Sequence, residues 1–208
     1  MTIRSKNDPG QEILYERLCP QEFLERLRDC PVAYLPLGTL EWHGPHLPLG
    51  TDMIEARELF ILAARQIGGI VLPGLFLGPD RHKTIGEKTY YGMDLYEGSV
   101  GVPEPYPPQQ MPGSAYWVDD MLYDQILWAV LCQLARAGFR VVAGCGHGPS
   151  VQRFLTLAER AGRELGLSLA APDVNAKDHR YVGDHAAASE SSNVLYFEAE
   201  LVHMERFA

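Results

Sequence analysis

The chain has 208 residues, of which 46% are hydrophobic, 22% charged and 10% aromatic, as in an ordinary globular protein. Eighteen lysines and arginines stand against 27 aspartates and glutamates, which gives a formal net charge of −9 at pH 7. A surface of this sign repels nucleic-acid phosphates and anionic lipid headgroups, so we expect neither nucleic acid nor a membrane as a partner. A chain of this length can bury one sizeable core, and we expect a single domain over residues 1–208.

The remaining composition indicates a cytoplasmic protein. The longest apolar run, Ile126–Cys132, has seven residues, far fewer than the roughly 20 that a membrane-spanning helix needs. The first ten residues lack the apolar stretch of a secretory signal. Widely spaced cysteines without a Cys-x-x-Cys pair indicate reduced thiols rather than disulfides or a cysteine-rich zinc site. These cysteines are Cys19, Cys30, Cys132 and Cys145.

Strand-like and helix-like patterns alternate along the chain. A short helix is predicted around Phe23–Leu27, followed by a strand over Val32–Leu37. The next helix runs from about Asp52, its expected N-cap, to Ile67. The later predicted elements are a strand over Ile70–Leu72, a helix over Trp117–Ala137, a strand over Phe139–Ala143, a helix over Pro149–Leu165, a strand over Leu167–Ala171 and a helix from about Ser189.

This alternation predicts an α/β fold with a mostly parallel sheet, because strands joined by helices of this length form right-handed βαβ units. If the four strands lie in the order 2-1-3-4, the first and third are neighbours and their connections cross to opposite faces. Open α/β sheets bind ligands at such a point, beyond the carboxyl ends of the strands. The loops after the first and third strands would then meet there.

One segment, Gly98–Gly113, interrupts the alternation, since eight of its sixteen residues are glycine or proline. Tyr96 and Tyr106 lie beside or within it. A long irregular segment inside a domain is typical of a lid, a binding loop or a subunit contact, and a plain surface excursion is the alternative.

The densest group of polar residues follows the first predicted strand. Glu41, His43, His46 and Asp52 fall within twelve residues, in a loop rich in glycine and proline. Glu41 and His43 are two residues apart, so in extended backbone both side chains project to the same side. A carboxylate and an imidazole placed in this way suit a divalent cation such as Zn²⁺, Mn²⁺ or Fe²⁺. Asp52 could bridge two such ions, or it could simply cap the helix.

Two further polar segments occur later in the chain. In Gly144-Cys-Gly-His-Gly-Pro-Ser150, glycines on both sides of His147 let the backbone turn sharply after the third strand. A phosphate-binding loop is the alternative, but no Lys-Ser/Thr follows and the spacing fits neither common fingerprint. Near the C-terminus, His185 and Glu190 bracket a helix start, where a glutamate also simply stabilises the helix dipole.

Together these segments resemble the signatures of the creatininase (creatinine amidohydrolase) family. The stretch from Leu35 to Asp52 resembles the family's L-P-x-G-S-x-E-Q-H-G-P-H-L-P-x-x-T-D. The stretch from Gly138 to Ser150 resembles its G-F … x-N-G-H-G-G-N, and His185 to Ser191 resembles its H-A-G-x-x-E-T. The three motifs occur in the family's order over residues 35–192, and the first is long and specific.

The resemblance implies a three-layer α/β/α fold and a binuclear metal centre that hydrolyses a non-peptide C–N bond, often in a homo-hexamer. It implies two divalent metal ions (Zn, Mn or Fe) as cofactors and a small cyclic or formyl amide as the substrate. The implied metal ligands are Glu41, His43, Asp52 as the bridge, His147 and Glu190. Creatinine-hydrolysing members take the fifth ligand two residues after the second-motif histidine, where this chain has Pro149, whereas other branches take it from the third motif. The implied catalytic residues are His185, as the proton shuttle, and Glu190.

The chain also departs from the family pattern, and these departures change the wall of the expected pocket. The sequence assigns no role to His46 or His82. The substituted positions are Cys145 for asparagine, Pro149 for glycine, Ser150 for asparagine and Ala187 for glycine.

Three hypotheses remain. The first is a metal-dependent amidohydrolase in which His185 protonates the leaving nitrogen. The second makes Cys145 a nucleophile and His147 its base, although no third group to orient the histidine is evident. The third is a non-catalytic, metal- or metabolite-binding homo-oligomer, because fold and ligands do not guarantee turnover. Nothing indicates a nucleotide, a flavin or a redox cofactor.

Overall fold

The structure, a computed structural model, describes residues 11–92, 114–172 and 185–207. The irregular segment expected over Gly98–Gly113 lies outside these ranges. Within them, the central sheet consists of β1 (Val32–Leu37), β2 (Ile70–Val71), β5 (Val141–Gly146) and β6 (Ser168–Ala170). All neighbours pair in parallel, in the order β2-β1-β5-β6, which is the expected order 2-1-3-4.

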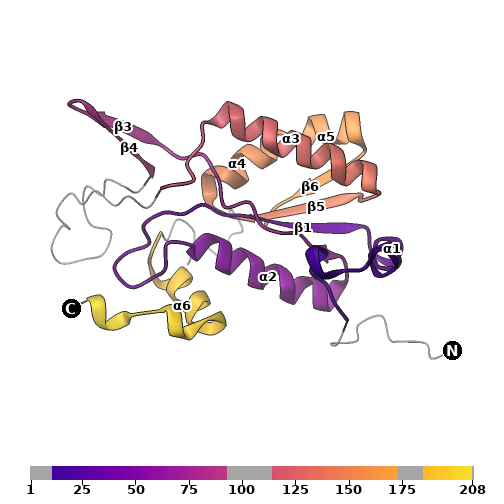
Figure 1. Cartoon of the computed structure of the whole chain (residues 1–208), viewed down its shortest axis with the longest axis horizontal. Helices are drawn as coiled ribbons and strands as arrows, with labels where there is room; N and C mark the ends of the chain where they lie inside the picture. Colours follow the sequence, from indigo (N-terminus) through magenta and orange to yellow (C-terminus); the bar gives the residue numbers. More distant parts are fainter. Residues whose placement is uncertain (1–10, 93–113, 173–184, 208) are drawn as a thin grey trace.

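Helices cover both faces of this sheet and complete a three-layer α/β/α arrangement (Figure 1). One face carries α3 (Asp120–Ala137), α4 (Gly148–Thr156) and α5 (Ala158–Leu165), and the other carries α2 (Thr51–Ile67) with α6 (Ala188–Phe197). The remaining helices are α1 (Pro20–Asp29) and the 3₁₀ helices η1 (Tyr15–Arg17), η4 (Ala199–Leu201) and η5 (Met204–Phe207). Among the described residues, no helix is both long enough and apolar enough to cross a membrane.

The two sides of β1 account for this layering. Leu35 and Leu37 point into the larger core, which lies against α3 and α4, whereas Tyr34 points the other way and packs on Phe60 of α2. Alternate residues of a strand project to opposite faces, so a strand covered on both sides is apolar throughout. The near-continuous apolar pattern of β1 therefore follows from its central place in the sheet.

Several predicted boundaries were wrong for identifiable reasons. Helix α2 begins at Thr51 with Gly50 as its N-cap, so Asp52 does not cap it but lies in its first turn. Strand β5 extends to Gly146 because its last residues pair with the end of β1. The helix predicted over Pro149–Leu165 is two helices, α4 and α5, which meet at Leu157.

A two-stranded antiparallel hairpin, β3 (His82–Ile85) and β4 (Lys88–Tyr91), was not predicted. It extends away from the rest of the molecule (Figure 1). At its base the rings of His82 and Tyr91 pack on Trp117, with centroid distances of 5.9 and 4.5 Å. The hairpin, the loop before α2 and the start of α6 all lie near the carboxyl ends of β1 and β5.

Candidate metal centre

The residues singled out from the three sequence motifs lie together at the carboxyl ends of β1 and β5. The loop between β1 and α2 supplies two of them, and the first turns of α2 and α6 supply one each. Of the other two, one directly follows β5 and one lies three residues before α6. These residues are, in that order, Glu41, His43, Asp52, Glu190, His147 and His185. The first and third strands are neighbours, so their polar loops meet as the strand order predicts.

A glycine lets β5 end close enough to β1 to deliver His147. Gly146 has φ +128°, and a Cβ atom added there would lie 2.2 Å from the carbonyl oxygen of Leu37. The next residue donates its backbone N–H to that same carbonyl, with His147 N 2.7 Å from Leu37 O. Only glycine has both the conformation and the small size that this close approach requires.

Three of the residues form a first group of donor atoms. Nδ1 of His147 lies 3.1 Å from Oε1 of Glu41 and 3.4 Å from Oδ2 of Asp52. The donor atoms of this first triad all lie within 4.8 Å of one another, as the ligands of one cation must. All three side chains are almost completely buried.

A second triad shares one member with the first. Nε2 of His43 lies 3.6 Å from Oδ2 of Asp52 and 3.9 Å from Oε2 of Glu190. These donor atoms, too, lie within 4.8 Å of one another. Asp52 is the residue common to these two triads, and a third group of donor atoms, from Glu41, His43 and His185, lies equally close together without it.

The three imidazoles are oriented by backbone carbonyls. Nδ1 of His43 lies 3.2 Å from the carbonyl oxygen of Glu41, Nε2 of His147 3.1 Å from that of Pro79, and Nε2 of His185 2.8 Å from that of Trp42. A carbonyl only accepts hydrogen bonds, so each of these nitrogens carries the proton. The other nitrogen of each ring is left to accept a proton or a cation, which is how histidine ligands are oriented in metal sites.

Several buried atoms of the cluster lack a hydrogen bond. In the part of the chain that the structure describes, Oε2 of Glu41, Nε2 of His43 and Oδ2 of Asp52 are buried without a hydrogen-bond partner. Leaving such an atom unpaired costs about 1–3 kcal/mol, and more for charged groups. A cation bound among these atoms would remove that cost. The donor set, three carboxylates and two imidazoles, is one that Zn²⁺ or Mn²⁺ binds.

Comparison with known proteins places the chain among its relatives. A family model described as "Creatininase: Creatinine amidohydrolase" matches residues 16–208. The chain belongs to the creatininase family. It is 33% identical over 73 residues to the creatinine amidohydrolase of Pseudomonas putida, a match that covers 35% of this chain and 28% of that protein.

Two other relatives have different names. The mycofactocin precursor peptide peptidase of Mycolicibacterium smegmatis is 26% identical over 178 residues, or 82% of this chain and 59% of that protein. The 3-dehydro-scyllo-inosose hydrolase of Thermotoga maritima is 24% identical over 137 residues, or 65% of this chain and 36% of that protein. The chain thus spans less than two thirds of the length of the curated relatives that it matches.

Solved structures confirm the creatininase fold. A crystal structure of creatininase aligns with a TM-score of 0.70 at 23% identity, over 95% of this chain and 76% of the other. A structure titled "Creatininase Mn" aligns with a TM-score of 0.66 at 23% identity, over 94% and 76% of the two chains. A mutant creatininase of the "Zn-Zn type" gives 0.69 at 22% identity, over 95% and 77%. At this identity the likeness establishes the fold.

Burial and mutual attraction shift the pKa values of the cluster in opposite directions. Burial raises the pKa of Glu190 to about 7 and that of Glu41 to about 7, since a buried carboxylate loses its hydration. Burial disfavours the charged form of His43, but the nearby carboxylates outweigh it and raise its pKa to about 9. Asp52 is also buried, yet His43 and His147 hold its pKa well below its usual value. Without a cation, protons therefore compensate the negative charge of the cluster.

The cysteine in the second motif is not placed as a nucleophile. Cys145 packs with Tyr34 and Phe60 in the smaller apolar cluster between the sheet and α2. Burial raises the pKa of its thiol to about 11, so almost none of it is thiolate at neutral pH. These observations argue against the cysteine hypothesis for this creatininase family member.

Two histidines left without a role have different surroundings. His46 is fully buried, with Nε2 2.7 Å from Oγ of Ser191, whereas His82 is exposed on the hairpin and is not part of the cluster. The sequence also gave no sign of Asp80, whose Oδ2 lies 3.7 Å from Nε2 of His147. A Gly-Pro-Asp turn after the apolar residues 75–77 was the available signal, and turns of this kind are too common to indicate a site.

Proposed function

We propose that this chain is a metal-dependent amidohydrolase that hydrolyses a non-peptide C–N bond in a small cyclic or formyl amide. The observation that carries the proposal is the position of Asp52 in both triads, with its Oδ2 buried and without a hydrogen-bond partner among the described residues. Membership of the creatininase family supports the same class of reaction.

The chain's own residues have separable roles in this proposal. Glu41, Asp52 and His147 would hold one divalent cation, and His43, Asp52 and Glu190 the other. Three carboxylates offset three of the four positive charges, so the centre keeps a net positive charge. Bound there, the two cations would polarise the amide carbonyl and lower the pKa of water toward ~7.

We assign the proton transfer to His185. Its Nε2–H is held by the carbonyl of Trp42, and its Nδ1 faces Glu41 at 3.8 Å from Oε1. Burial and the neighbouring His43 lower the pKa of His185, which keeps its Nδ1 available as a base. In our proposal Nδ1 accepts a proton as the water attacks and then donates it to the leaving nitrogen. Its side chain is 33% exposed, against 0% for His43 and 4% for His147, so it is the most accessible of the three imidazoles.

Metal content tests the proposal directly. We expect about two transition-metal ions per chain, by elemental mass spectrometry, in protein purified without chelators. Asp52→Ala should lose both metal and amide hydrolysis, because it removes the residue shared by the two triads. Full metal occupancy and an unchanged rate in Asp52→Ala would refute the bridging role. One ion in the unaltered protein would point to a mononuclear hydrolase and put the Glu190 ligand in doubt.

A non-catalytic family member is the second candidate. The observation that favours it is the fate of two substituted motif residues: Cys145 packs beneath α2, and Ser150 is fully buried, donating to the carbonyl oxygen of Gly38 at 3.5 Å. Cys145 therefore presents no polar group to the cluster, and the hydroxyl of Ser150 is already bound to a backbone carbonyl. The names of the three relatives specify three different substrates, so the amide itself must be found by a screen. Two bound metals with no hydrolysis across that screen would favour this candidate.

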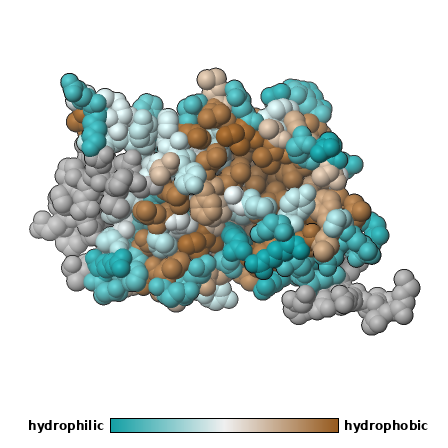
Figure 2. Space-filling model, viewed as in Figure 1, coloured by the Kyte–Doolittle hydropathy of each residue, from teal (hydrophilic) through white to brown (hydrophobic). Residues whose placement is uncertain are grey.

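We also propose that the chain forms a homo-oligomer, with a hexamer as the expected size. Apolar side chains cover a large part of one face, over α3 and the helices beside it (Figure 2). Extended apolar areas of this kind commonly mark subunit contacts. Light scattering after size-exclusion chromatography measures the subunit number directly, and a monomer at micromolar concentration would contradict the proposal. The exposed apolar residues of α3 and α4 include Met121, Leu122 and Leu155.

A further inference from the structure

A buried hydrogen bond joins the metal-site loop to α6. Nε2 of His46 lies 2.7 Å from Oγ of Ser191, and the two residues are 1% and 8% exposed. They are 145 positions apart in the chain. Neither belongs to a triad, but each lies close to a triad member in the sequence: His46 three residues after His43, and Ser191 directly after Glu190.

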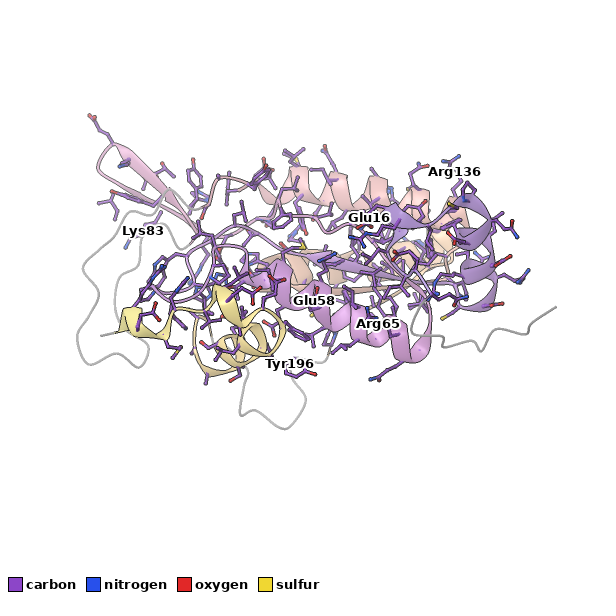
Figure 3. All side chains as sticks on the ribbon, turned by 60° about the horizontal axis from the view of Figure 1, so that its bottom comes forward. Glu16, Glu58, Arg65, Lys83, Arg136 and Tyr196 are labelled. Carbon is purple, nitrogen blue, oxygen red and sulfur yellow. The ribbon has the colours of Figure 1, made fainter. Side chains whose placement is uncertain are left out.

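The attachments of α6 explain why this bond matters. The helix lies on α2, over the half that begins at Thr51, and Tyr196 extends from its exposed side (Figure 3). The side-chain amide of Asn193 donates to the carboxylate of Glu55 on α2. The segment after α6 returns to His46, whose carbonyl oxygen accepts the backbone N–H of His203 at 2.9 Å. His46 therefore holds both α6 and the chain that follows it.

The two triads depend on α6 to different degrees. The first triad draws its members from the loop after β1, from α2 and from the end of β5, all of which are tied to the sheet. The second triad takes Glu190 from α6, and the carboxylate Oε2 lies 3.9 Å from Nε2 of His43. A small shift of α6 would change this distance and leave the first triad in place.

We propose that His46 is a positioning residue for the second cation site, acting through Ser191 to set the place of Glu190 opposite His43. This inference rests on the proposed function, because it assumes two cation sites. Metal ligands must be placed to within about 0.2 Å, so a helix released from its side-chain contact binds the ion less well. Substitution of a residue that orients a metal ligand typically lowers the metal affinity by about 10- to 100-fold.

The test compares zinc binding in variants of the full chain. Ser191→Ala removes only the hydroxyl, and Ser192→Ala is the matched control, because Ser192 lies on the exposed side of α6 and bonds only to the helix carbonyl of Ala188 among the contacts described. His46→Leu removes the bond from the other side, and His46→Gln restores a nitrogen at the distance of Nε2. Zinc stoichiometry and the two dissociation constants are measured by competition with a coloured chelator.

We expect Ser191→Ala and His46→Leu to bind the second zinc ion about 10- to 100-fold more weakly, with the first unchanged. Ser192→Ala should match the unaltered protein, and His46→Gln should recover most of the lost affinity. If Ser191→Ala binds both ions with the affinities of the unaltered protein, the inference is overturned. A parallel weakening of both sites would also overturn it. If His46→Leu fails to fold, which its far-ultraviolet circular dichroism reports, Ser191→Ala still decides.

The unaltered protein separates the two possible failures. Binding of two zinc ions that is insensitive to Ser191→Ala overturns only the role of His46. Failure of the unaltered protein to bind a second ion removes the second cation site from the proposed function, and the positioning role falls with it.

Discussion

Oδ2 of Asp80 lies 3.7 Å from Nε2 of His147, on the side of the imidazole ring that faces away from the two triads. The nearby carbonyl of Pro79 takes the hydrogen bond, at 3.1 Å. The carboxylate therefore adds negative charge behind a ring whose other nitrogen, Nδ1, belongs to the first triad. A carboxylate in this position makes a histidine a stronger metal ligand.

We predict that Asp80→Asn weakens the first cation site about 10-fold, because it removes this charge and keeps the shape of the side chain. The carbonyl of Pro79 still orients the ring, so the loss should fall short of that caused by removing His147. Competition with a chelator measures the change. An unchanged dissociation constant would mean that the backbone carbonyl alone is sufficient.

The metal-free protein should lose stability as the pH rises from about 5 to 9. In the folded chain the pKa values of Glu190 and Glu41 are raised to about 7, from about 4.5 in the unfolded chain. Their protonation therefore stabilises the folded state fully below pH 4.5, and this stabilisation is lost as the pH rises past 7. His43, raised from 6.5 to about 9, favours folding below 6.5 and loses that effect as the pH passes 9. The pKa of His185 is lowered, so this residue makes stability rise with pH, but only below pH 6.5.

Thermal unfolding with EDTA at pH 5, 7 and 9 tests this dependence. The melting temperature should fall at each step. Saturating zinc should reverse the trend, since deprotonated ligands bind metal better and binding stabilises the folded state. A melting temperature that rises steadily with pH in EDTA would contradict the protonation of the cluster.

Cys145 should be chemically inert and dispensable. Its raised pKa and its packing under α2 predict much slower alkylation by iodoacetamide at pH 7.5 than that of the exposed Cys19. Peptide mapping by mass spectrometry gives both rates in one sample. Cys145→Ala should keep its metal and its hydrolytic rate to within about twofold, as a small change in packing allows. Loss of turnover with metal retained would revive the cysteine nucleophile.

Gly146→Ala should destabilise the fold by at least about 3 kcal/mol, because the added Cβ would meet the carbonyl oxygen of Leu37 at 2.2 Å and the backbone has φ +128°. Gly148→Ala is the matched control, since an added Cβ there meets nothing within 4 Å. Denaturant midpoints compare the two variants. Similar midpoints would show that β5 can move away from β1 without cost.

Patterns local in sequence were the part of the fold and site that could be predicted. The apolar run of β1 gave its bounds correctly, and the strand order brought the loops after β1 and β5 together. The spacing of Glu41 and His43 placed their side chains in one cluster. The metal roles of these residues remain predictions.

Other features depend on contacts between distant segments, which no local pattern contains. The bond from His46 to Ser191 and the approach of Asp80 to His147 exist only after the chain has folded. Asp52 resembled an N-cap by residue type, but the helix starts one residue earlier. The carboxylate of Asp52 points to the histidines instead. The hairpin β3–β4 was missed because its strands are short and mostly exposed, and lack the apolar alternation of a core strand.

The carbonyls that orient His43, His147 and His185 belong to the main chain. A substitution at Trp42 or Pro79 would change the side chain and leave the accepting oxygen where it is. The proton positions of the three imidazoles are thus encoded in the path of the backbone rather than in the identity of neighbouring residues. Sequences can therefore diverge widely and, as long as they preserve that path, keep the same imidazole nitrogens available for a cation.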